Sequence, residues 1–238
     1  MLARAGVPAF RTPEACADAF RAFFSWRSPA VERSGEKKAF RGNAFELLEN
    51  LGIPVVEQQV ARAPDFAHAV PFPVAVKVMD VEHKTEAGGV FLDVSREAFA
   101  LTAKRLKREK ILVQKMERGL AEAIVGYRDD PVVGPLVLVG AGGVLSEIYR
   151  DFAMRLAPVS EAEAQEMIAE VKGLAVIRGY RNLPKGDVPA LARAVSAFSR
   201  AASFANISEA EINPLIVKAD GVVAVDALLV FDTPPSPL

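Results

Sequence analysis

The sequence predicts an α+β (α/β) fold with a large share of antiparallel sheet. Apolar runs of strand length are separated by tight turns, such as Gly140-Ala141-Gly142-Gly143 and Ala219-Asp220-Gly221. An Asp-Gly pair between two alternating apolar runs is a strong hairpin signal. Helix starts stand between these runs, and Ser160 with Glu163 has the spacing of a capping box. Hairpins interspersed with capped helices indicate this class.

The composition indicates a folded protein with a substantial core. The chain has 238 residues, of which 51% are hydrophobic and 25% charged, and its formal net charge is −1. A nearly neutral chain lacks the positive charge with which proteins displace counterions from nucleic acid, so no nucleic-acid partner is expected. One cysteine, Cys16, excludes an internal disulfide framework, and two histidines argue against a histidine-based metal centre.

No membrane partner is expected either. No apolar run reaches the roughly 20 residues that span a bilayer, and residues 1–10 lack the apolar core of a signal peptide. With the single cysteine, this predicts a cytoplasmic protein.

The first 35 residues are expected to form an N-terminal extension that ends in a linker. Thr12-Pro13-Glu14 predicts a helix start, because Thr caps, Pro fits the first turn and Glu suits the positive helix end. Phe20 and Phe24 lie on an apolar stripe of this helix, and residues 33–37 read as the linker.

Apolar periodicity, capping residues and glycine stops predict the remaining elements. The expected helices cover 38–50, 65–70, 95–107, 160–172 and 187–204. The expected strands cover 53–56, 73–78, 90–94, 110–115, 120–127, 135–139, 144–149, 210–218 and 222–231. The residues 233–238 include three prolines and are expected to be a tail.

Lys77 is the first residue that could carry chemistry. It lies in a strand of small and β-branched residues, Val74-Ala75-Val76-Lys77-Val78. A lysine there is either an edge residue that faces water or a fixed cation for phosphate oxygens. The strand alone leaves both interpretations open.

A polar loop follows this strand and contains His83 and the pair Gly88-Gly89. A histidine can relay a proton or accept a phosphoryl group, and adjacent glycines let backbone N–H groups approach phosphate. The alternative is a solvated hairpin loop, which the residue types alone favour.

The last hairpin carries a candidate metal site. Strand alternation places Glu211 and Asn213 on one face, and the Asp-Gly turn brings Asp226 back beside them. Oxygen ligands from amide and carboxylate side chains, completed by phosphate and water, suit Mg²⁺. The alternative is a polar outer face of the hairpin without a metal.

Taken together, the motifs between residues 36 and 232 resemble one family. After Lys77 and the His83 loop come further matches, in order: Gln114-Lys115-Met116, Glu122-Ala123-Ile124-Val125-Gly126, Asp129-Asp130-Pro131, Gly140-Ala141-Gly142-Gly143, Arg155-Leu156-Ala157-Pro158, Glu211-Ile212-Asn213-Pro214-Leu215 and Asp226-Ala227. This ordered set is similar to the ATP-grasp (β) subunit or domain of ADP-forming acyl-CoA (acetyl-CoA) synthetases, which is related to the succinyl-CoA synthetase β subunit. The N-terminal extension resembles the tail of the CoA-ligase domain that precedes the ATP-grasp part in fused members.

The resemblance implies an ATP-grasp fold at 36–232, with a smaller subdomain at about 60–118 and a larger one at 119–232. ATP or ADP would lie between the two subdomains. The implied site residues are His83 and Lys77 for catalysis; Lys77, Gly88, Gly89, Gln114, Lys115, Met116 and Glu122 for the nucleotide; and Asn213, Asp226 and Glu211 for Mg²⁺.

The implied activity is that of an acid–CoA ligase: acid, CoA and ATP reversibly give acyl-CoA, ADP and phosphate. The chain would need a CoA-binding partner that carries a phosphohistidine, which predicts a hetero-oligomer. A second interpretation is a non-catalytic regulatory ATP-grasp module of an acyltransferase or related assembly. A third is a ligase that uses an acyl-phosphate, against which the His83 loop argues. Leu228 stands where many relatives carry arginine. This departure puts the full catalytic activity of the chain in question.

Overall fold

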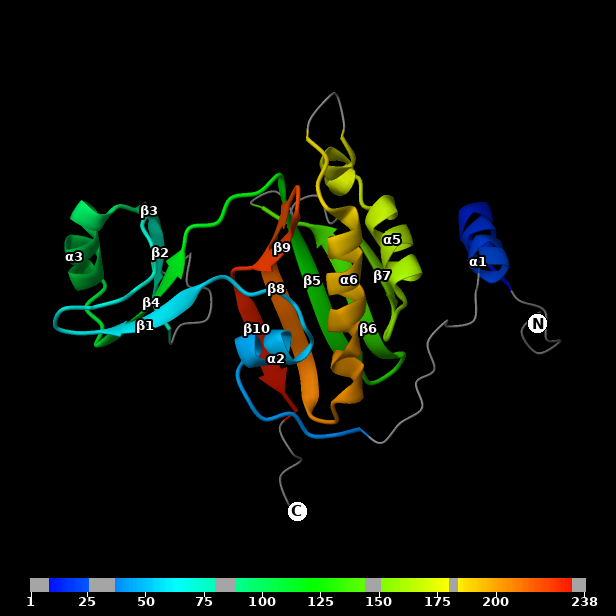
Figure 1. The fold of residues 1–238 in the computed structure, drawn as a ribbon. Coiled ribbons are helices and arrows are strands. Elements are labelled where there is room, and N and C mark those ends of the chain that lie inside the picture. Colours follow the sequence, from blue (N-terminus) through cyan, green and yellow to red (C-terminus); the bar gives the residue numbers. More distant parts are fainter. Residues whose placement is uncertain (1–8, 26–36, 80–88, 144–150, 180–183, 233–238) are drawn as a thin grey trace, which may run out of the picture. The chain divides into compact units, whose positions relative to one another are not determined.

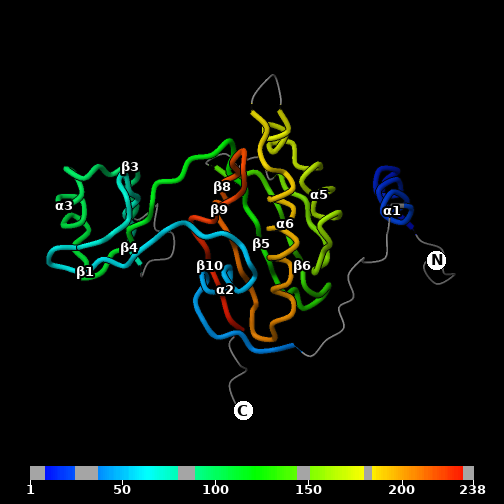
Figure 2. The backbone as a smooth tube through the Cα atoms, in the orientation of Figure 1, coloured from blue at the N-terminus to red at the C-terminus, as the bar shows by residue number. Residues whose placement is uncertain are grey.

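The computed structural model describes residues 9–25, 37–79, 89–143, 151–179 and 184–232 (Figures 1 and 2). The chain divides into two compact units, residues 1–32 and 33–238. In the described ranges, no helix is long and apolar enough to cross a membrane.

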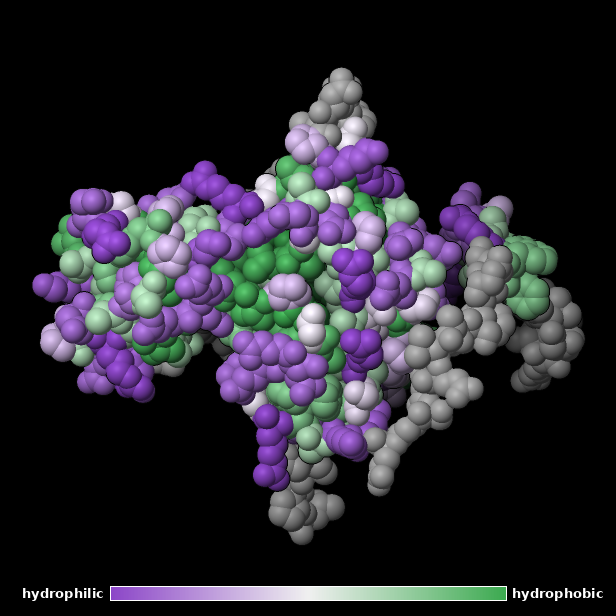
Figure 3. All heavy atoms as spheres, viewed as in Figure 1, coloured by the Kyte–Doolittle hydropathy of each residue, from purple (hydrophilic) through white to green (hydrophobic). Residues whose placement is uncertain are grey.

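The first unit contains helix α1 (Pro13–Ser25). The backbone N–H of Ala15 donates to Thr12 Oγ1 at 3.2 Å, so the predicted start of this helix is confirmed. Phe20, Phe23 and Phe24 are 58%, 76% and 71% exposed, and Figure 3 shows apolar side chains along α1.

The second unit contains a small antiparallel sheet of four strands. Their order is β1 (Gln58–Arg62), β4 (Lys110–Lys115), β2 (Val74–Lys77) and β3 (Val90–Val94). Helix α3 (Arg96–Arg105) begins after Ser95, whose side chain accepts from the Ala98 N–H. This sheet has a core of its own, formed by Ala61, Phe66, Val70, Val74, Val76, Val94, Phe99, Ala103, Ile111 and Val113.

A larger antiparallel sheet follows. Its order is β10 (Ala227–Phe231), β8 (Ile207–Lys218), β5 (Ala121–Asp130), β6 (Gly134–Ala141) and β7 (Phe152–Leu156), and β9 (Gly221–Ala224) also pairs with β8. Helices α2 (Ala44–Asn50), α5 (Glu161–Glu170) and α6 (Val188–Ser199), with the 3-10 turns η2 (Gly173–Arg178) and η4 (Arg200–Ser203), pack on one face of this sheet (Figure 1).

Local capping explains where these helices begin. Asn43 and Ser160 each form a complete capping box, with Glu46 and Glu163 respectively, and Asp187 accepts from the N–H three residues on. Each cap satisfies backbone donors that the first turn leaves without a partner, worth about 1 kcal/mol per cap. The predicted capping box at Ser160 is therefore confirmed.

Several predicted boundaries were wrong. The residues 53–56 form no strand: Val55 makes a single bridge to Ala224, and the first strand of the small sheet starts at Gln58. The expected helix at 65–70 is absent: a turn covers 63–65, and 66–70 has no regular secondary structure. The strand expected at 222–231 is interrupted at Val225 and Asp226, so that β9 and β10 pair with different halves of β8. The strand expected at 144–149 lies outside the described residues.

Candidate functional site

Lys77 is buried at the end of an interior strand. β2 lies between β3 and β4, and the lysine is 6% exposed. Its Nζ donates to the Val225 carbonyl at 2.8 Å and lies 3.4 Å from Asp226 Oδ2. The alternative of a water-facing edge lysine is therefore wrong: this ammonium joins the small sheet to the break between β9 and β10.

Asp226 is held firmly in that break. Its Oδ1 accepts from the Ala227 N–H at 3.0 Å, and its carbonyl oxygen accepts from the Asn213 N–H at 3.1 Å. The second contact places Asn213 directly beside Asp226, and Glu211 lies two residues earlier on the same face of β8. The three predicted metal residues are thus brought together, with Lys77 beside them.

The oxygens of this group are the type that Mg²⁺ prefers. Asn213 is exposed, and Glu211 and Asp226 are half-buried, so their oxygens remain within reach of an ion from solvent. Among the described residues, no three His, Cys, Asp or Glu side chains lie together so that they could hold a metal ion by themselves. A Mg²⁺ ion here would therefore need the Asn213 amide, and water or phosphate would complete its ligands.

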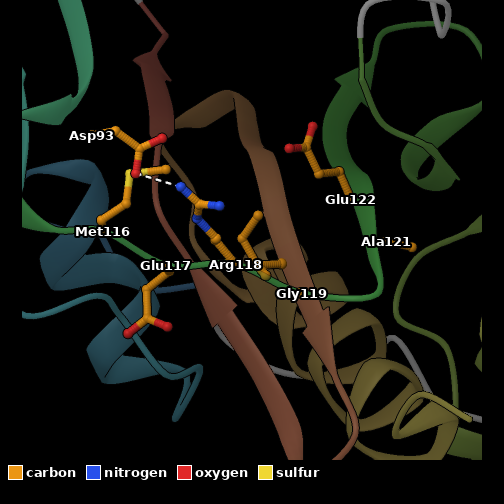
Figure 4. Close-up of a pocket in the computed structure, with 8 residues that line it drawn as sticks. Asp93, Met116, Glu117, Arg118, Gly119, Ala121 and Glu122 are labelled. Atoms are coloured by element: carbon orange, nitrogen blue, oxygen red, sulfur yellow. Dashed lines mark hydrogen bonds and ion pairs between the residues drawn. The ribbon is translucent and has the colours of Figure 1, made fainter. Parts of the chain in front are cut away.

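A cavity of about 400 Å³ lies where the chain passes from β4 to β5. This volume is within the usual range for small-molecule sites. Figure 4 shows Asp93, Met116 and Arg118 on one side, with Glu122 reaching in from β5. The lining residues are Asp93, Met116, Glu117, Arg118, Gly119, Ala121, Glu122 and Ile216.

Gln114, Lys115 and Met116, which the resemblance implies for the nucleotide, contribute in different ways. Met116 lines the cavity, and its N–H donates to the Pro73 carbonyl at 3.2 Å. Gln114 is 1% exposed and donates to the Gln58 side chain at 2.8 Å, so its side chain supports β1 instead of lining the cavity. The Nζ of Lys115 lies 3.2 Å from Glu117 Oε1.

Glu117 lies between two lysines. Its side chain is 11% exposed, and it pairs with both Lys115 and Lys218. Burial opposes ionisation of this carboxyl, but hydrogen bonds from the two ammonium groups outweigh burial and lower its pKa. Glu117 is therefore a carboxylate at neutral pH.

Arg118 connects the cavity to the small sheet. Its guanidinium lies 2.6 Å from Asp93 Oδ1, and both side chains line the cavity (Figure 4). Asp93 has φ +54°, a backbone conformation that non-glycine residues adopt infrequently. Sequence reasoning missed Asp93, Glu117 and Arg118. The signal available for the last two was their position directly after Gln114-Lys115-Met116.

Glu122 is positioned by close contact with the turn after β6. The Gly142 N–H donates to the Glu122 carbonyl at 2.8 Å, and a Cβ on Gly142 would lie 3.0 Å from Glu122. A side chain at this turn would therefore push Glu122 away. Of the predicted glycine pair, Gly89 accepts from the Val78 N–H at 2.9 Å. Gly88 and His83 lie outside the described residues.

Comparison with known proteins identifies relatives over most of the chain. A family model described as an ATP-grasp domain matches residues 30–231. "Acetate--CoA ligase [ADP-forming] I subunit beta" of Pyrococcus furiosus is 33% identical over 207 residues, which are 79% of this chain and 89% of that protein. "Acetate--CoA ligase [ADP-forming] I" of Archaeoglobus fulgidus is 35% identical over 203 residues, and the match covers 78% of this chain but 30% of that protein.

Solved structures show the same similarity. The dinucleotide forming acetyl-coenzyme A synthetase 1 of Ca. Korarchaeum cryptofilum, in complex with coenzyme A and Mg-AMPPCP, superposes with a TM-score of 0.71 at 30% identity. The match covers 90% of this chain and 98% of that one. In that structure, the phosphohistidine segment points towards the nucleotide binding site. The chain therefore belongs to the ATP-grasp family and, within it, to the relatives of the β subunits of ADP-forming acetate–CoA ligases.

Proposed function

We propose that this chain is the nucleotide-binding part of an ADP-forming acid–CoA ligase. It would transfer a phosphoryl group between ATP/ADP and a histidine of a CoA-binding partner. The observation that supports this most strongly is the contact of Lys77 with Asp226, whose carbonyl oxygen accepts from the Asn213 N–H. In the forward direction, the histidine nitrogen attacks the γ-phosphorus, the bond to the β–γ bridging oxygen breaks, and ADP leaves with that electron pair while the histidine loses its proton.

This reaction requires positioned charge more than covalent chemistry by the protein. Lys77 supplies a buried cation whose position is set by the Val225 carbonyl before any phosphate arrives. Because the ammonium loses little freedom on binding, its contact with phosphate costs little entropy. Met116, the linker after it and Glu122 would surround the base and ribose.

Mg²⁺ belongs to this proposal, held by Asn213 and Asp226 with Glu211 nearby. When bound, the ion would neutralise phosphate charge as it develops during transfer. Lys77 would keep its bond to the Val225 carbonyl and exchange its contact with the Asp226 carboxylate for a phosphate oxygen when the nucleotide binds. His83 and Gly88 remain predicted members of the site.

The partner follows from the same reaction. This chain spans about 30% of the length of the Archaeoglobus relative, so activation of the acid and binding of CoA belong to a further domain or subunit. We therefore propose a hetero-oligomer in which the partner carries the phosphohistidine.

Two measurements test the proposal. Calorimetric titration with ATP and ADP, each with and without Mg²⁺, should show saturable binding that is tighter with the ion. Incubation with γ-³²P-ATP and the purified CoA-binding partner should then label a histidine of the partner, seen as acid-labile and base-stable radioactivity. Absence of nucleotide binding in both the free chain and the reconstituted complex would refute the proposal. Binding without transfer would favour the regulatory ATP-grasp module instead.

A further inference from the structure

Helices α2, α5 and α6 cover one face of the large sheet, and among the described residues the opposite face, here called the open face, carries half-buried and exposed side chains. Pairing aligns Leu228, Glu211, Gly126, Leu138 and Met154 in one row across β10, β8, β5, β6 and β7. The neighbouring row through Val125, Val139 and Ala153 is fully or almost fully buried, because α5 and α6 pack on that side. The row through Glu211 and Met154 therefore faces away from the helices.

One side of this open face is apolar. Phe152, Met154 and Leu156 alternate along β7 and are 48%, 41% and 39% exposed. Leu136 and Leu138 of β6 lie beside them, half-buried. We call these five side chains the β7 patch. The fold does not require apolar residues here, since polar side chains would suit a solvated sheet face equally well. Contiguous exposed apolar patches of a few hundred Å² on monomeric proteins are often functional.

The β7 patch is continuous with the proposed metal residues. From Glu211, the row runs through Gly126 to Leu138 and then to Met154. Three inter-strand steps of about 4.8 Å make this roughly 14 Å. Gly126 has no side chain to stand between the two regions, and a Cβ there would lie 3.8 Å from the Leu138 side chain.

We propose that the β7 patch is the docking surface for the histidine-bearing segment of the CoA-binding partner. This inference rests on the proposed function, because the segment must bring its histidine to the γ-phosphate beside Asp226 and Asn213. In the Korarchaeum structure, a phosphohistidine segment points towards the nucleotide site. An extended segment of about four or five residues would cover the 14 Å between patch and site.

The size of the patch suits a transient partner better than a second copy of this chain. The three exposed side chains of β7 offer roughly 250 Å² of remaining apolar surface. A stable dimer buries about 800 Å² on each partner. A segment that must deliver its phosphoryl group and leave again needs only the smaller contact. The transfer itself is unchanged: the histidine N–P bond forms as the bond to the bridging oxygen of ADP breaks.

The test is the double variant Met154→Lys/Leu156→Lys in the reconstituted complex. Both side chains are exposed on an edge strand, so the variant should fold, and an unchanged unfolding temperature checks this. The matched controls are Leu101→Lys on α3 and Val132→Lys between β5 and β6, at residues that are 70% and 88% exposed. Histidine labelling from γ-³²P-ATP is measured while the partner subunit is titrated, and ATP binding is measured by calorimetry.

We expect the apparent KM for the partner to rise at least tenfold in the double variant, with the Kd for ATP within twofold of the original and the controls unaffected. An unchanged KM would overturn the docking inference while leaving the proposed function intact. If the unsubstituted chain binds no ATP, or transfers no phosphoryl group, the proposed function fails first and the inference falls with it.

A second measurement does not depend on the double variant. A photo-crosslinking amino acid at position 154 should capture the partner's histidine-bearing segment, identified by mass spectrometry, and the same group at position 101 should not. Capture of another part of the partner, or of a second copy of this chain, would overturn the inference.

Discussion

Replacing Lys77 by methionine separates its charge from its shape. Methionine keeps most of the side-chain volume in a site that is 6% exposed, so the surrounding strands should pack as before. What is lost is the hydrogen bond to the Val225 carbonyl and the ion pair with Asp226. The variant therefore tests whether this cation serves the nucleotide or only the connection between the two sheets.

The structure sets the expected magnitudes. A hydrogen bond to a charged group contributes about 1.5–3 kcal/mol, and breaking a fully buried ion pair costs about 3–5 kcal/mol. The side chain of Asp226 is 28% exposed, so water can partly replace the ammonium there. We expect Lys77→Met to lower the free energy of unfolding by about 2 kcal/mol. Loss of a similar contact with phosphate should weaken ATP binding by about 30-fold.

Calorimetry with Mg-ATP measures the second effect, and urea unfolding measures the first. Lys110→Met is the control, because Lys110 is exposed at the start of β4 in the same sheet. A folded Lys77→Met variant whose Kd for ATP stays within threefold would refute the assignment. Lys77 would then be a structural residue that ties the sheets together.

Three further predictions concern the metal and the pH dependence of stability. Asp226→Asn should remove most of the tightening of ATP binding by Mg²⁺, measured as the ratio of Kd values without and with the ion; an unchanged ratio would contradict the ligand assignment. The pKa of Glu117 is lowered, so its stabilisation is present above about pH 4.5 and is lost as the pH falls. Lys218→Met should therefore lower the free energy of unfolding at pH 7 by about 1 kcal/mol, measured by urea unfolding. The same substitution should have less effect at pH 3. Burial lowers the pKa of His68, so below about pH 6.5 this histidine binds a proton more readily in the unfolded chain than in the folded one. The protein therefore loses stability as the pH falls from about 6.5 to about 5, and His68→Phe should make this loss smaller, measured by urea unfolding across that range.

Local signals predicted where three of the helices begin. The capping box at Ser160 and the caps at Ser95 and Asp187 depend on residues three positions apart, so the sequence contains the whole interaction. The Asp-Gly turn between β8 and β9 was predicted for the same reason.

Strand limits in the small sheet depend on distant partners. Gln58 pairs with Gln114, and no local pattern distinguishes this strand from the run at 53–56 that was predicted. The interruption at Asp226 likewise follows from contacts with Asn213 and Lys77. These boundaries are set by tertiary contacts and not by propensity.

The candidate site also depends on contacts between residues that are far apart in the sequence. Lys77 and Asp226 are 149 residues apart, so their meeting was expected only from the resemblance to a known family. Asp93 had no motif, and Arg118 had only its position directly after Gln114-Lys115-Met116, since a surface ion pair between two elements leaves no periodic trace in sequence.

The chain enters and leaves the small sheet at one place. The chain enters this sheet after Glu57 and leaves it at Lys115, and the Lys115 N–H donates to the Glu57 carbonyl at 2.9 Å. The small sheet is thus an insertion whose two ends touch, and its apolar core is separate from that of the large sheet. Excision of the intervening residues, with a short glycine turn in their place, should leave a large sheet that folds alone. The small sheet of a homologous protein should be able to replace this one at the same junction.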